Sequence, residues 1–339
     1  MHAIVLVGGF GTRLRPLTNT LPKSMLTIGN EPIITRLVER LGRHGVTTVT
    51  LSLGFLPDPF LEAFPDDRCG GVALRYAVEP EPLDTAGAIR FAAREAGVDG
   101  TFVVVNGDVI NDLDVAALVR RHREVGATAT LHLTGVPDPS AFGVVELGGD
   151  DRVGRFLEKP APGTTDSNLI NAGTYVMEPV VIDAIPAGRR VSVERETFPA
   201  LAAEGGLFGM ATDDYWLDVG RPELLLQANL DRLAGRFDAG LVADPAATYG
   251  VHSGATVHPS AAVRSSSVDR GATIGAGATI ERSVVLAGAI IGEDVVVHES
   301  VVMGVVAAGA TLRGAVVGAE GVVAAGGQVT NERVPVVAP

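Results

Sequence analysis

The 339-residue chain has a single cysteine, Cys69, and few aromatic residues, which make up 5% of it. One cysteine excludes an internal disulfide and a cysteine-rich zinc or iron–sulfur site, and it favours a reducing compartment. No run of about 18 apolar residues occurs, so no membrane-spanning helix is expected. The apolar segment at residues 3–7 is too short for a signal peptide. We therefore expect a cytoplasmic protein without a membrane partner.

Positive charge is also scarce, because 27 Lys+Arg stand against 40 Asp+Glu and leave a net charge of −13. A protein that binds nucleic acid regardless of sequence needs clustered cations to neutralise phosphates, so we expect no nucleic-acid partner. Apolar residues, in contrast, make up 46% of the chain. At roughly 100–200 residues per domain, the length and composition predict two domains with packed cores.

The residues from Gly240 onwards differ in kind from the rest, since they hold 22 valines and 15 glycines but only one aromatic residue, Tyr249. Within them an apolar residue recurs about every six positions, beginning at Val257 and Val263. A period of six with small residues between is the signature of a hexapeptide-repeat β-helix, whereas an antiparallel sandwich or a flexible tail does not require it. We therefore predict a parallel β-helix over residues 251–331, with about 18 residues per coil, and a loose tail over residues 334–339.

The part of the chain before the β-helix, residues 1–235, alternates between apolar runs of strand length and segments with apolar residues at helical spacing. This alternation predicts an α/β domain with a doubly wound, mostly parallel sheet, which binds its ligands at the carboxyl ends of the strands. Residues 236–250 would link this domain to the β-helix. The predicted strands are 3–7, 49–53, 73–78 and 102–105, and the predicted helices are 31–44, 85–96, 115–125 and 222–234.

A glycine-rich turn, GGFGTRLRPLT over residues 8–18, follows the first predicted strand and precedes Pro22 and Lys23. Glycines let backbone N–H groups approach phosphate oxygens closely, because no Cβ stands in the way. Arg13 and Lys23 add positive charge. The dinucleotide fingerprint needs a glycine at Leu14, and the P-loop needs Gly-Lys-Ser/Thr, so neither motif fits. Taken alone, the turn is either a phosphate cradle or an ordinary strand–helix turn with solvated cations.

Together with later motifs, this turn resembles the signature of sugar-1-phosphate nucleotidylyltransferases. The resemblance spans the predicted α/β domain and is closest to mannose-1-phosphate guanylyltransferases, also called GDP-mannose pyrophosphorylases. It implies a Rossmann-like nucleotidyltransferase domain followed by a left-handed β-helix. The segments that carry it are LVGGFGTRL (6–14), PLT (16–18), PK (22–23), EPLDTAG (81–87), NGD (106–108), FGVV (142–145), FLEKP (156–160), INAG (170–173) and WLDVG (216–220).

The implied reaction is attack by a sugar 1-phosphate oxygen on the α-phosphorus of a nucleoside triphosphate, with pyrophosphate leaving. Such chemistry needs alignment and cations around the phosphates rather than a protein nucleophile. By resemblance, Arg13 would neutralise the departing pyrophosphate, and Lys23 would hold the α-phosphate region. The other residues that the resemblance assigns to the nucleotide are Leu6, Gly8, Gly9, Gly11, Thr12, Glu79 and Gly87.

Two aspartates are candidate metal ligands. Asp108 follows the predicted strand 102–105 at the ligand-binding end, and Asp218 lies far away in the sequence. Carboxylates suit Mg²⁺, which keeps water and substrate phosphate oxygens as its other ligands. By resemblance this pair binds Mg²⁺ as the cofactor. From the residues alone, Asp108 could equally cap a turn.

The candidate sugar site rests on four residues. By resemblance, Lys159 would hold the sugar phosphate and Glu158 would accept hydrogen bonds from sugar hydroxyls. Gly143 would give access to the backbone, and Asn171 would supply an amide that both donates and accepts. The alternative for Glu158 and Lys159 is a solvated turn ahead of Pro160.

Glu79 is the residue that bears on the choice of base. Guanine presents N1–H and N2–H₂ as adjacent donors, which one carboxylate can accept together. Glu79 stands where thymidylyltransferases of the family carry a base-reading glutamine, and Gly87 replaces a second glutamine found there. GTP is therefore the favoured nucleotide. Asp84 departs from the pattern, since guanylyltransferases usually have glycine there, and Ser24 and Met25 also depart from it.

Two alternatives to a GDP-mannose-forming enzyme stay open on the sequence. The chain could use another nucleotide, such as UTP, or the 1-phosphate of a different sugar or cyclitol. It could also be a non-catalytic subunit that senses an NDP-sugar, although the presence of Arg13, Lys23, Asp108 and Asp218 favours an enzyme. The flat, apolar sides of the predicted coils further predict a homo-oligomer formed through the β-helix.

Overall fold

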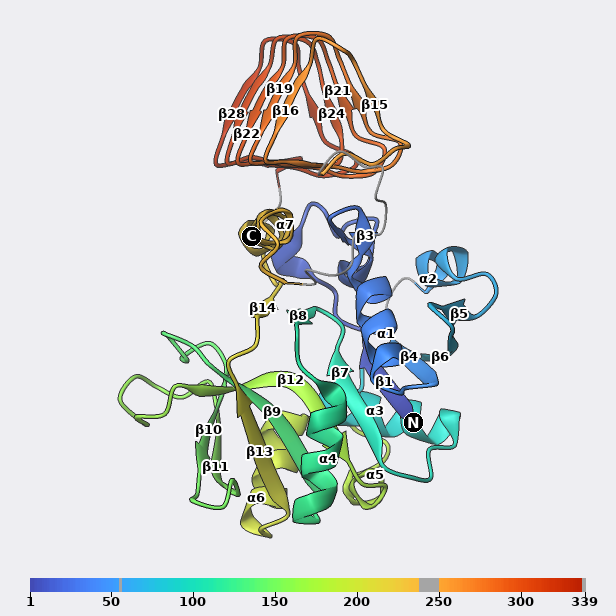
Figure 1. Cartoon of the computed structure of the whole chain (residues 1–339), viewed down its shortest axis with the longest axis vertical. Coiled ribbons are helices and arrows are strands. Elements are labelled where there is room, and N and C mark those ends of the chain that lie inside the picture. Colours follow the sequence, from blue (N-terminus) through green and yellow to red (C-terminus); the bar gives the residue numbers. More distant parts are fainter. Residues whose placement is uncertain (55–56, 238–249, 337–339) are drawn as a thin grey trace. The chain divides into compact units, whose positions relative to one another are not determined.

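A computed structural model describes residues 1–54, 57–237 and 250–336, which form two compact units (Figure 1). The sheet unit consists of Met1–Gly9 and Ile34–Trp216, and the coil unit consists of Phe10–Ile33 and Leu217–Pro339. These units differ from the predicted domain bounds, because residues 10–33 pack with the C-terminal elements. The predicted linker falls mostly on residues 238–249, which lie outside the described residues.

The sheet unit is built on four parallel strands in the order β7-β1-β4-β6. Strands and helices alternate along the chain as predicted, because each strand is an apolar run and each helix carries its apolar residues on one side. The predicted doubly wound α/β fold is confirmed. These strands are β1 His2–Leu6, β4 Thr48–Leu53, β6 Val72–Val78 and β7 Phe102–Asn106, and the helices between and after them are α1 Ile33–Arg43, α2 Asp58–Ala63, α3 Asp84–Ala96 and α4 Val115–Val125.

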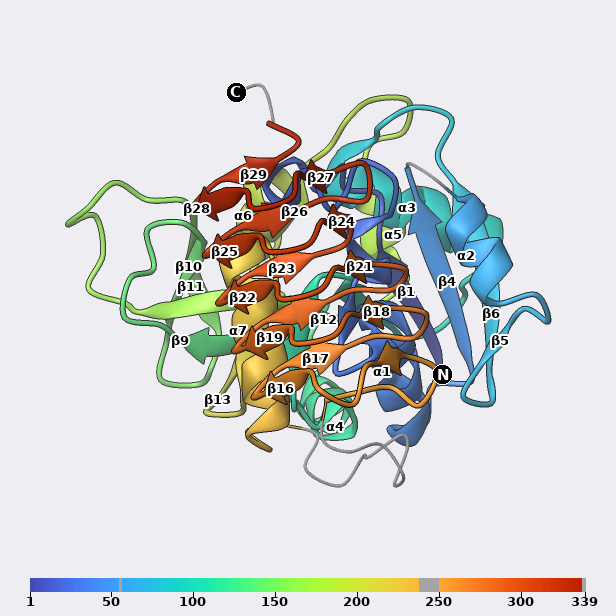
Figure 2. The same cartoon turned by 90° about the horizontal axis from the view of Figure 1, so that it is seen from above.

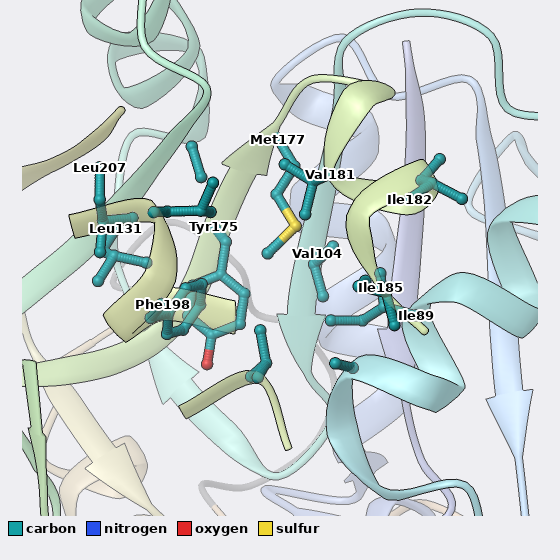
Figure 3. Packing of buried hydrophobic residues seen from close by; sticks show 14 of the residues in the cluster. Ile89, Val104, Leu131, Tyr175, Met177, Val181, Ile182, Ile185, Phe198 and Leu207 are labelled. Carbon is teal, nitrogen blue, oxygen red and sulfur yellow. The ribbon is translucent and has the colours of Figure 1, made fainter. Parts of the chain in front are cut away.

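The second half of the unit extends this sheet beyond β7. β12 pairs antiparallel with β7, β9 and β10, and β10 pairs antiparallel with β11. Figure 3 shows Tyr175 of β12 packed against Phe198 of α6, with ring centroids 5.0 Å apart. The remaining elements are β5 Arg68–Cys69, β8 Val109–Asn111, β9 Ala129–Gly135, β10 Gly143–Leu147, β11 Val153–Glu158, β12 Leu169–Met177, α5 Val180–Ala184, the π-helix η3 Val193–Thr197, α6 Phe198–Ala203, β13 Leu207–Thr212 and, at the passage to the coil unit, β14 Trp216–Asp218.

The order of the strands creates a crevice in the sheet. From β1 the chain builds outward through β4 and β6, and it then returns to the other side of β1 to form β7. The carboxyl ends of β1 and β7, at Leu6 and Asn106, therefore lie side by side where the winding reverses. Open α/β sheets bind their ligands at such a reversal.

The coil unit contains three parallel sheets of five short strands, which stack as successive coils (Figure 2). This is the predicted parallel β-helix, and three sheets of short strands fit the left-handed class. Apolar residues at the hexad positions form its core, as predicted. The strands are β15 Thr256–Val257, β16 Ala262–Arg264, β17 Ser267–Val268, β18 Thr273–Ile274, β19 Thr279–Glu281, β20 Val284–Val285, β21 Ile290–Ile291, β22 Val296–His298, β23 Val301–Val302, β24 Val305–Val306, β25 Thr311–Arg313, β26 Val316–Val317, β27 Val322–Val323, β28 Gln328–Thr330 and β29 Arg333–Val334.

Two details of the predicted β-helix were wrong. Thr256 pairs with Thr273 in the next coil, and Ile290 pairs with Val305. The first of these coils, with 17 residues, agrees with the predicted length of about 18, whereas the second, with 15 residues, is shorter because some of its steps between strands are shorter than the hexad. The stack also includes β29, so it runs past residue 331 and the predicted tail began too early.

Segments from both ends of the coil unit accompany the β-helix. Residues 10–33 form two short helices and a two-stranded hairpin. Helix α7 follows β14 in the sequence and precedes the β-helix. Within the described residues, no helix combines the length and apolar character needed to cross a bilayer. The elements are η1 Thr12–Leu14, η2 Lys23–Met25, β2 Thr27–Ile28, β3 Glu31–Pro32 and α7 Pro222–Leu233.

Candidate active site

A cavity of about 320 Å³ opens at the carboxyl ends of β1, β4, β6 and β7 in the sheet unit. Its position matches the crevice that the strand order creates. Five of the predicted nucleotide or metal residues line it, namely Leu6, Gly8, Gly9, Glu79 and Asp108. The lining also includes residues that the sequence analysis did not assign to the site: Ser52, Gly54, Pro82, Asp84, Thr85, Ala88, Asn106 and Arg190.

Glu79 is half-buried, and its carboxylate is held by two donors. The Ser52 hydroxyl donates to Oε1 at 3.2 Å, and the Leu83 N–H donates to Oε2 at 3.0 Å. A Cβ at Gly8 would lie 3.4 Å from Glu79 Oε1 and 3.1 Å from the Gly54 nitrogen, so a glycine is needed for this close approach. Each carboxylate oxygen keeps acceptor capacity for a further donor, because a carboxylate offers about four lone-pair sites.

Asp84 begins α3 with a φ of 63°, a left-handed conformation that glycine adopts more easily. Its Oδ1 accepts a hydrogen bond from the Thr85 N–H at 2.8 Å. The Thr85 hydroxyl in turn donates to Glu194 Oε2 at 2.7 Å. The departure from the family glycine therefore places a carboxylate in the cavity lining.

Gly87 lies elsewhere on α3 and does not belong to the cavity lining. A Cβ there would lie 2.8 Å from Cβ of Leu83 and 3.6 Å from the Arg189 carbonyl oxygen. Only the Leu83 contact is too close for a Cβ, so the absence of a side chain at Gly87 makes room for Leu83 at the start of α3.

Three of the predicted sugar residues meet on the antiparallel half of the sheet. Gly143 pairs with Glu158 across β10 and β11, and a Cβ at Gly143 would lie 3.0 Å from Glu158 Oε2. Lys159 Nζ lies 3.6 Å from Glu158 Oε1. Burial raises the pKa of Glu158, and the negative charge of Glu194 adds to this effect while Lys159 opposes it.

Asn171 lies on β12, which pairs with β10 one residue away, at Ile170 and Val144. Its side-chain nitrogen donates to the Tyr175 hydroxyl at 2.9 Å, and its oxygen accepts from the Gly173 N–H at 3.0 Å. These two bonds fix the orientation of the amide. Asn171 therefore adds a held polar group beside the strand that carries Gly143.

The predicted cations lie in the coil unit. Thr12 and Arg13 are exposed on η1, after Gly11, whose φ of 58° favours glycine. Lys23 Nζ lies 3.6 Å from Asp218 Oδ1, and these side chains are 12% and 24% exposed. A Cβ at Gly220 would lie 2.9 Å from Arg13 Nη2 and 3.3 Å from Asp218 Oδ1. Arg13, Lys23 and Asp218 thus converge around Gly220.

The carboxylates that could hold a metal are few. Among the described residues, no group of three or more His, Cys, Asp or Glu side chains gathers as a metal cage. Of the two predicted metal ligands, Asp108 belongs to the sheet unit and Asp218 to the coil unit. Asp108 lines the cavity, and Asp218 lies beside Lys23.

Two of the residues that the sequence analysis missed carried a signal that was available. Ser52 lies one residue before the end of the predicted strand 49–53, and Asn106 follows the predicted strand 102–105, so both are polar residues near carboxyl ends of parallel strands. Glu194 and Arg190 carried no comparable signal. They approach α3 only because the segment before η3 folds back onto it, where the Val191 carbonyl accepts from the Ala86 N–H.

Comparison with known proteins gives a family match over residues 2–235, to the family described as nucleotidyl transferase. The mannose-1-phosphate guanylyltransferase of Mycobacterium tuberculosis is 42% identical over 270 residues, which cover 79% of this chain and 74% of that protein. A mannose-1-phosphate guanyltransferase of Aspergillus oryzae is 39% identical over 270 residues, covering 78% and 73%.

Solved structures resemble the chain as well. HddC from Yersinia pseudotuberculosis, complexed with GMP-PN, superimposes with a TM-score of 0.58 at 28% identity, covering 67% of this chain and 97% of that one. A Bacillus anthracis protein described as a glucose-1-phosphate thymidylyltransferase gives a TM-score of 0.60 at 24% identity, covering 68% and 94%. The latter likeness concerns the fold alone.

Proposed function

We propose that this chain, which belongs to the nucleotidyl transferase family, transfers a guanylyl group from GTP to mannose 1-phosphate and releases pyrophosphate. The observation that carries the proposal is the cavity in which the glycine turn, Glu79 and Asp108 share one lining. Relatives with about 40% identity that are named mannose-1-phosphate guanylyltransferases support the choice of substrates. HddC, which was solved with GMP-PN, supports a guanine nucleotide.

The base would be recognised by Glu79. Its carboxylate is oriented by Ser52 and Leu83 and lines the cavity with free acceptor capacity toward a ligand. Guanine N1–H and N2–H₂ could donate to it together, whereas uracil and thymine present only one N–H between two carbonyls. A charge-assisted pair of this kind would favour GTP by about 1.5–3 kcal/mol per hydrogen bond.

The phosphates would be held by the turn after β1 and by the two cations of the coil unit. Gly8, Gly9, Gly11 and Thr12 would offer backbone N–H groups to the triphosphate. A sugar 1-phosphate oxygen would then form a bond to the α-phosphorus while the bond to the β-phosphate oxygen breaks. Arg13 would neutralise the charge that develops on the departing pyrophosphate, and Lys23 would do so at the α-phosphate.

Asp108 and Asp218 would hold Mg²⁺ as the cofactor of this reaction. Carboxylate oxygens are ligands that suit Mg²⁺, which would keep water and substrate phosphate oxygens as its other ligands. The bound ion would supply charge stabilisation to the reacting phosphates. Asp218 would also position Lys23, since their side chains form an ion pair.

The sugar 1-phosphate would bind beside β10, β11 and β12. Lys159 would pair with its phosphate, and Glu158 would accept hydrogen bonds from the sugar hydroxyls. Gly143 leaves room next to Glu158, where a Cβ would meet Glu158 Oε2 at 3.0 Å. Asn171, held by Tyr175 and Gly173, would supply a donor or an acceptor.

A homo-oligomer formed through the β-helix is part of the same proposal. Ile290, Val305 and Val322 occupy paired positions on one face of the stack, and Ile290 and Val322 are 49% and 66% exposed. A second copy would remove this apolar row from water. Light scattering is expected to give a particle mass that is a multiple of the single-chain mass of 35.0 kDa. The double variant Ile290→Lys and Val322→Lys should have a lower particle mass. A wild-type particle of the single-chain mass would contradict the proposal.

The test of the function is a substrate panel. GTP, ATP, UTP, CTP and dTTP are each combined with mannose, glucose and galactose 1-phosphates, and pyrophosphate release is followed with Mg²⁺ present. We expect the highest kcat/KM with GTP and mannose 1-phosphate. A clear preference for another pair would change the proposed substrates but not the proposed type of reaction. No turnover with any pair would favour a non-catalytic subunit that senses an NDP-sugar.

A further inference from the structure

The segment that carries Arg13 and Lys23 is fastened to the β-helix at both of its ends. We call residues 10–26 the cation loop. The described part of it contains only two short helices, η1 and η2, so its own hydrogen bonds fix few of its dihedral angles. Its conformation therefore depends on what holds its ends.

The rear end of the loop is bound to the first coil through Asp269. This carboxylate follows β17 and is 2% exposed. The Thr27 hydroxyl donates to its Oδ2, and the Asn30 amide, with its nitrogen turned toward the coil, donates to its Oδ1 at 2.7 Å. A buried carboxylate that loses such a donor is costly, so this link is strongly favoured.

The same end is bound to α7 through Asn229, which is 1% exposed. Its side-chain nitrogen donates to the Thr27 carbonyl at 3.2 Å, and its oxygen accepts from the Gly29 N–H at 2.9 Å. Residues 27–29, which follow Lys23 by one turn, are thus held between α7 and the β-helix.

The front end of the loop is bound to the last coils. Arg333 Nη1 donates to the Arg15 carbonyl at 2.7 Å. A Cβ at Gly318 would lie 2.7 Å from Cβ of Pro16 and 2.8 Å from its carbonyl oxygen. The backbone of the loop, just after Arg13, therefore lies directly on the coil.

The two anchors lie at opposite edges of one sheet. β17, just before Asp269, and β29, which contains Arg333, are the outer strands of the five-stranded sheet β17-β20-β23-β26-β29. At about 4.8 Å per strand spacing, four spacings separate the anchors by roughly 19 Å. The cation loop thus bridges the width of this sheet.

We propose that the β-helix is a positioning element for phosphoryl-group chemistry, in which Asp269 and Arg333 fix the cation loop so that Arg13 and Lys23 keep their places. Asp269, Thr27 and Arg333 are positioning residues, because they act on the reaction through the loop. The inference rests on the proposed function for its catalytic consequence, whereas the fixing of the loop is a property of the chain itself. Small displacements of a transition-state cation lower kcat more than they weaken substrate binding.

The test compares three variants of the full chain at a temperature where all are folded. Thr27→Val removes the donor to Asp269 and keeps the shape, and Thr27→Ser restores the hydroxyl. Ser283→Ala removes a buried hydroxyl from the stack itself, where Ser283 accepts from the Ser300 N–H at 3.1 Å and donates to the Glu281 carbonyl at 2.7 Å. The readouts are kcat, the KM for sugar 1-phosphate, and hydrogen exchange of the amides of residues 10–26.

We expect Thr27→Val to lower kcat about tenfold with little change in the KM for sugar 1-phosphate, and to speed exchange in the cation loop. Thr27→Ser and Ser283→Ala should keep wild-type values of kcat and of loop exchange. Arg333→Ala, a change at the surface, should speed exchange around Arg15 and serves if Thr27→Val does not fold. Wild-type kcat and exchange in Thr27→Val, or equal losses in Ser283→Ala, would overturn the proposal.

Failure of the proposed function would look different. A wild-type chain that transfers no nucleotide with any substrate pair would rule out the proposed reaction. The hydrogen-exchange measurement alone would then decide whether the β-helix fixes the cation loop. Fast exchange in Thr27→Val but not in Ser283→Ala would uphold the fixing, and equal exchange in both would reject it.

Discussion

The open sheet and the β-helix are both made of parallel apolar strands, yet their polar side chains serve different ends. At the edge of the sheet, Glu79 and Asp108 face a cavity of about 320 Å³. In the β-helix, Ser266 and Ser283 are fully buried, and each accepts from a backbone N–H of the next coil, at 3.0 and 3.1 Å. Polar groups at the sheet edge thus line a cavity, where we propose that they meet a ligand, while those within the coils are satisfied by the protein itself.

Two ion pairs of the coil unit, one beside the predicted cations and one on the β-helix, extend this comparison to charged side chains. Lys23 and Asp218 are largely buried, whereas Arg282 and Glu299 on the β-helix are half exposed at a similar separation. Lys23→Met should lower kcat by about 10²–10³-fold, because one preorganised charge contact to a transition state is worth that much. Arg282→Met is the matched control and should leave kcat unchanged, since exposed pairs contribute little. Equal effects of the two changes in steady-state assays would remove the distinction.

A second prediction concerns the selectivity that the cavity gives. Glu79→Gln should lower kcat/KM for GTP by about tenfold to a hundredfold, because an amide donor would face a guanine donor. The rates with UTP and dTTP should change little, so the gap between nucleotides narrows. ITP, which lacks the 2-amino group, should be a poorer substrate than GTP for the wild type and equal to it for the variant. An unchanged GTP preference in competition assays would reject the role of Glu79.

The hydroxyls buried between coils of the β-helix should respond to substitution in stability rather than in activity. Ser300 accepts from the Ala315 N–H at 3.0 Å, and both groups are buried. Ser300→Ala leaves that N–H unsatisfied and should cost about 1–2 kcal/mol in the free energy of unfolding. Denaturant titration measures this, and kcat below the transition should equal that of the wild type. A large loss of kcat without a loss of stability would contradict the comparison.

We expect pH to have a smaller effect on the free energy of unfolding. Burial raises the pKa of Asp269 to about 6, so the folded chain holds this proton more tightly than the unfolded chain does. The resulting stability is fully present below about pH 4 and is lost as the pH rises through about 6. Between pH 5 and 7.5 the wild type should lose on the order of 1 kcal/mol relative to Asp269→Asn. Parallel stability curves for the two proteins would contradict the raised pKa.

The sequence was sufficient to predict those features that depend on a regular spacing of apolar residues along a short segment. The hexad spacing predicted most inward positions of the β-helix, such as Val268 and Val329, because each coil repeats the same short strand and turn. Val302 and Val306, which also belong to this core, fall where the spacing shortens and were missed. Alternating apolar runs and helical spacing likewise predicted the central strands and the helices α1, α3, α4 and α7. The family motifs predicted five of the residues that line the cavity, namely Leu6, Gly8, Gly9, Glu79 and Asp108.

Features that depend on contacts between distant segments could not be read in this way. Arg190 joins the cavity only through the return of its segment to α3, and Asp269 meets Thr27 across 242 residues of sequence. The grouping of residues 10–33 with the coils has the same origin, since Asn229 holds the backbone at Gly29. The composition of one segment does not predict which distant segment it pairs with.

The central claim, guanylyl transfer to a sugar 1-phosphate, is tested most directly by ³¹P NMR of the full-length protein with GTP, mannose 1-phosphate and Mg²⁺. We predict that the signals of GTP and mannose 1-phosphate decay together while GDP-mannose and pyrophosphate appear in equal amounts. Addition of chelator should stop the reaction. Release of orthophosphate with GDP, or unchanged spectra with a correctly folded protein, would contradict the account.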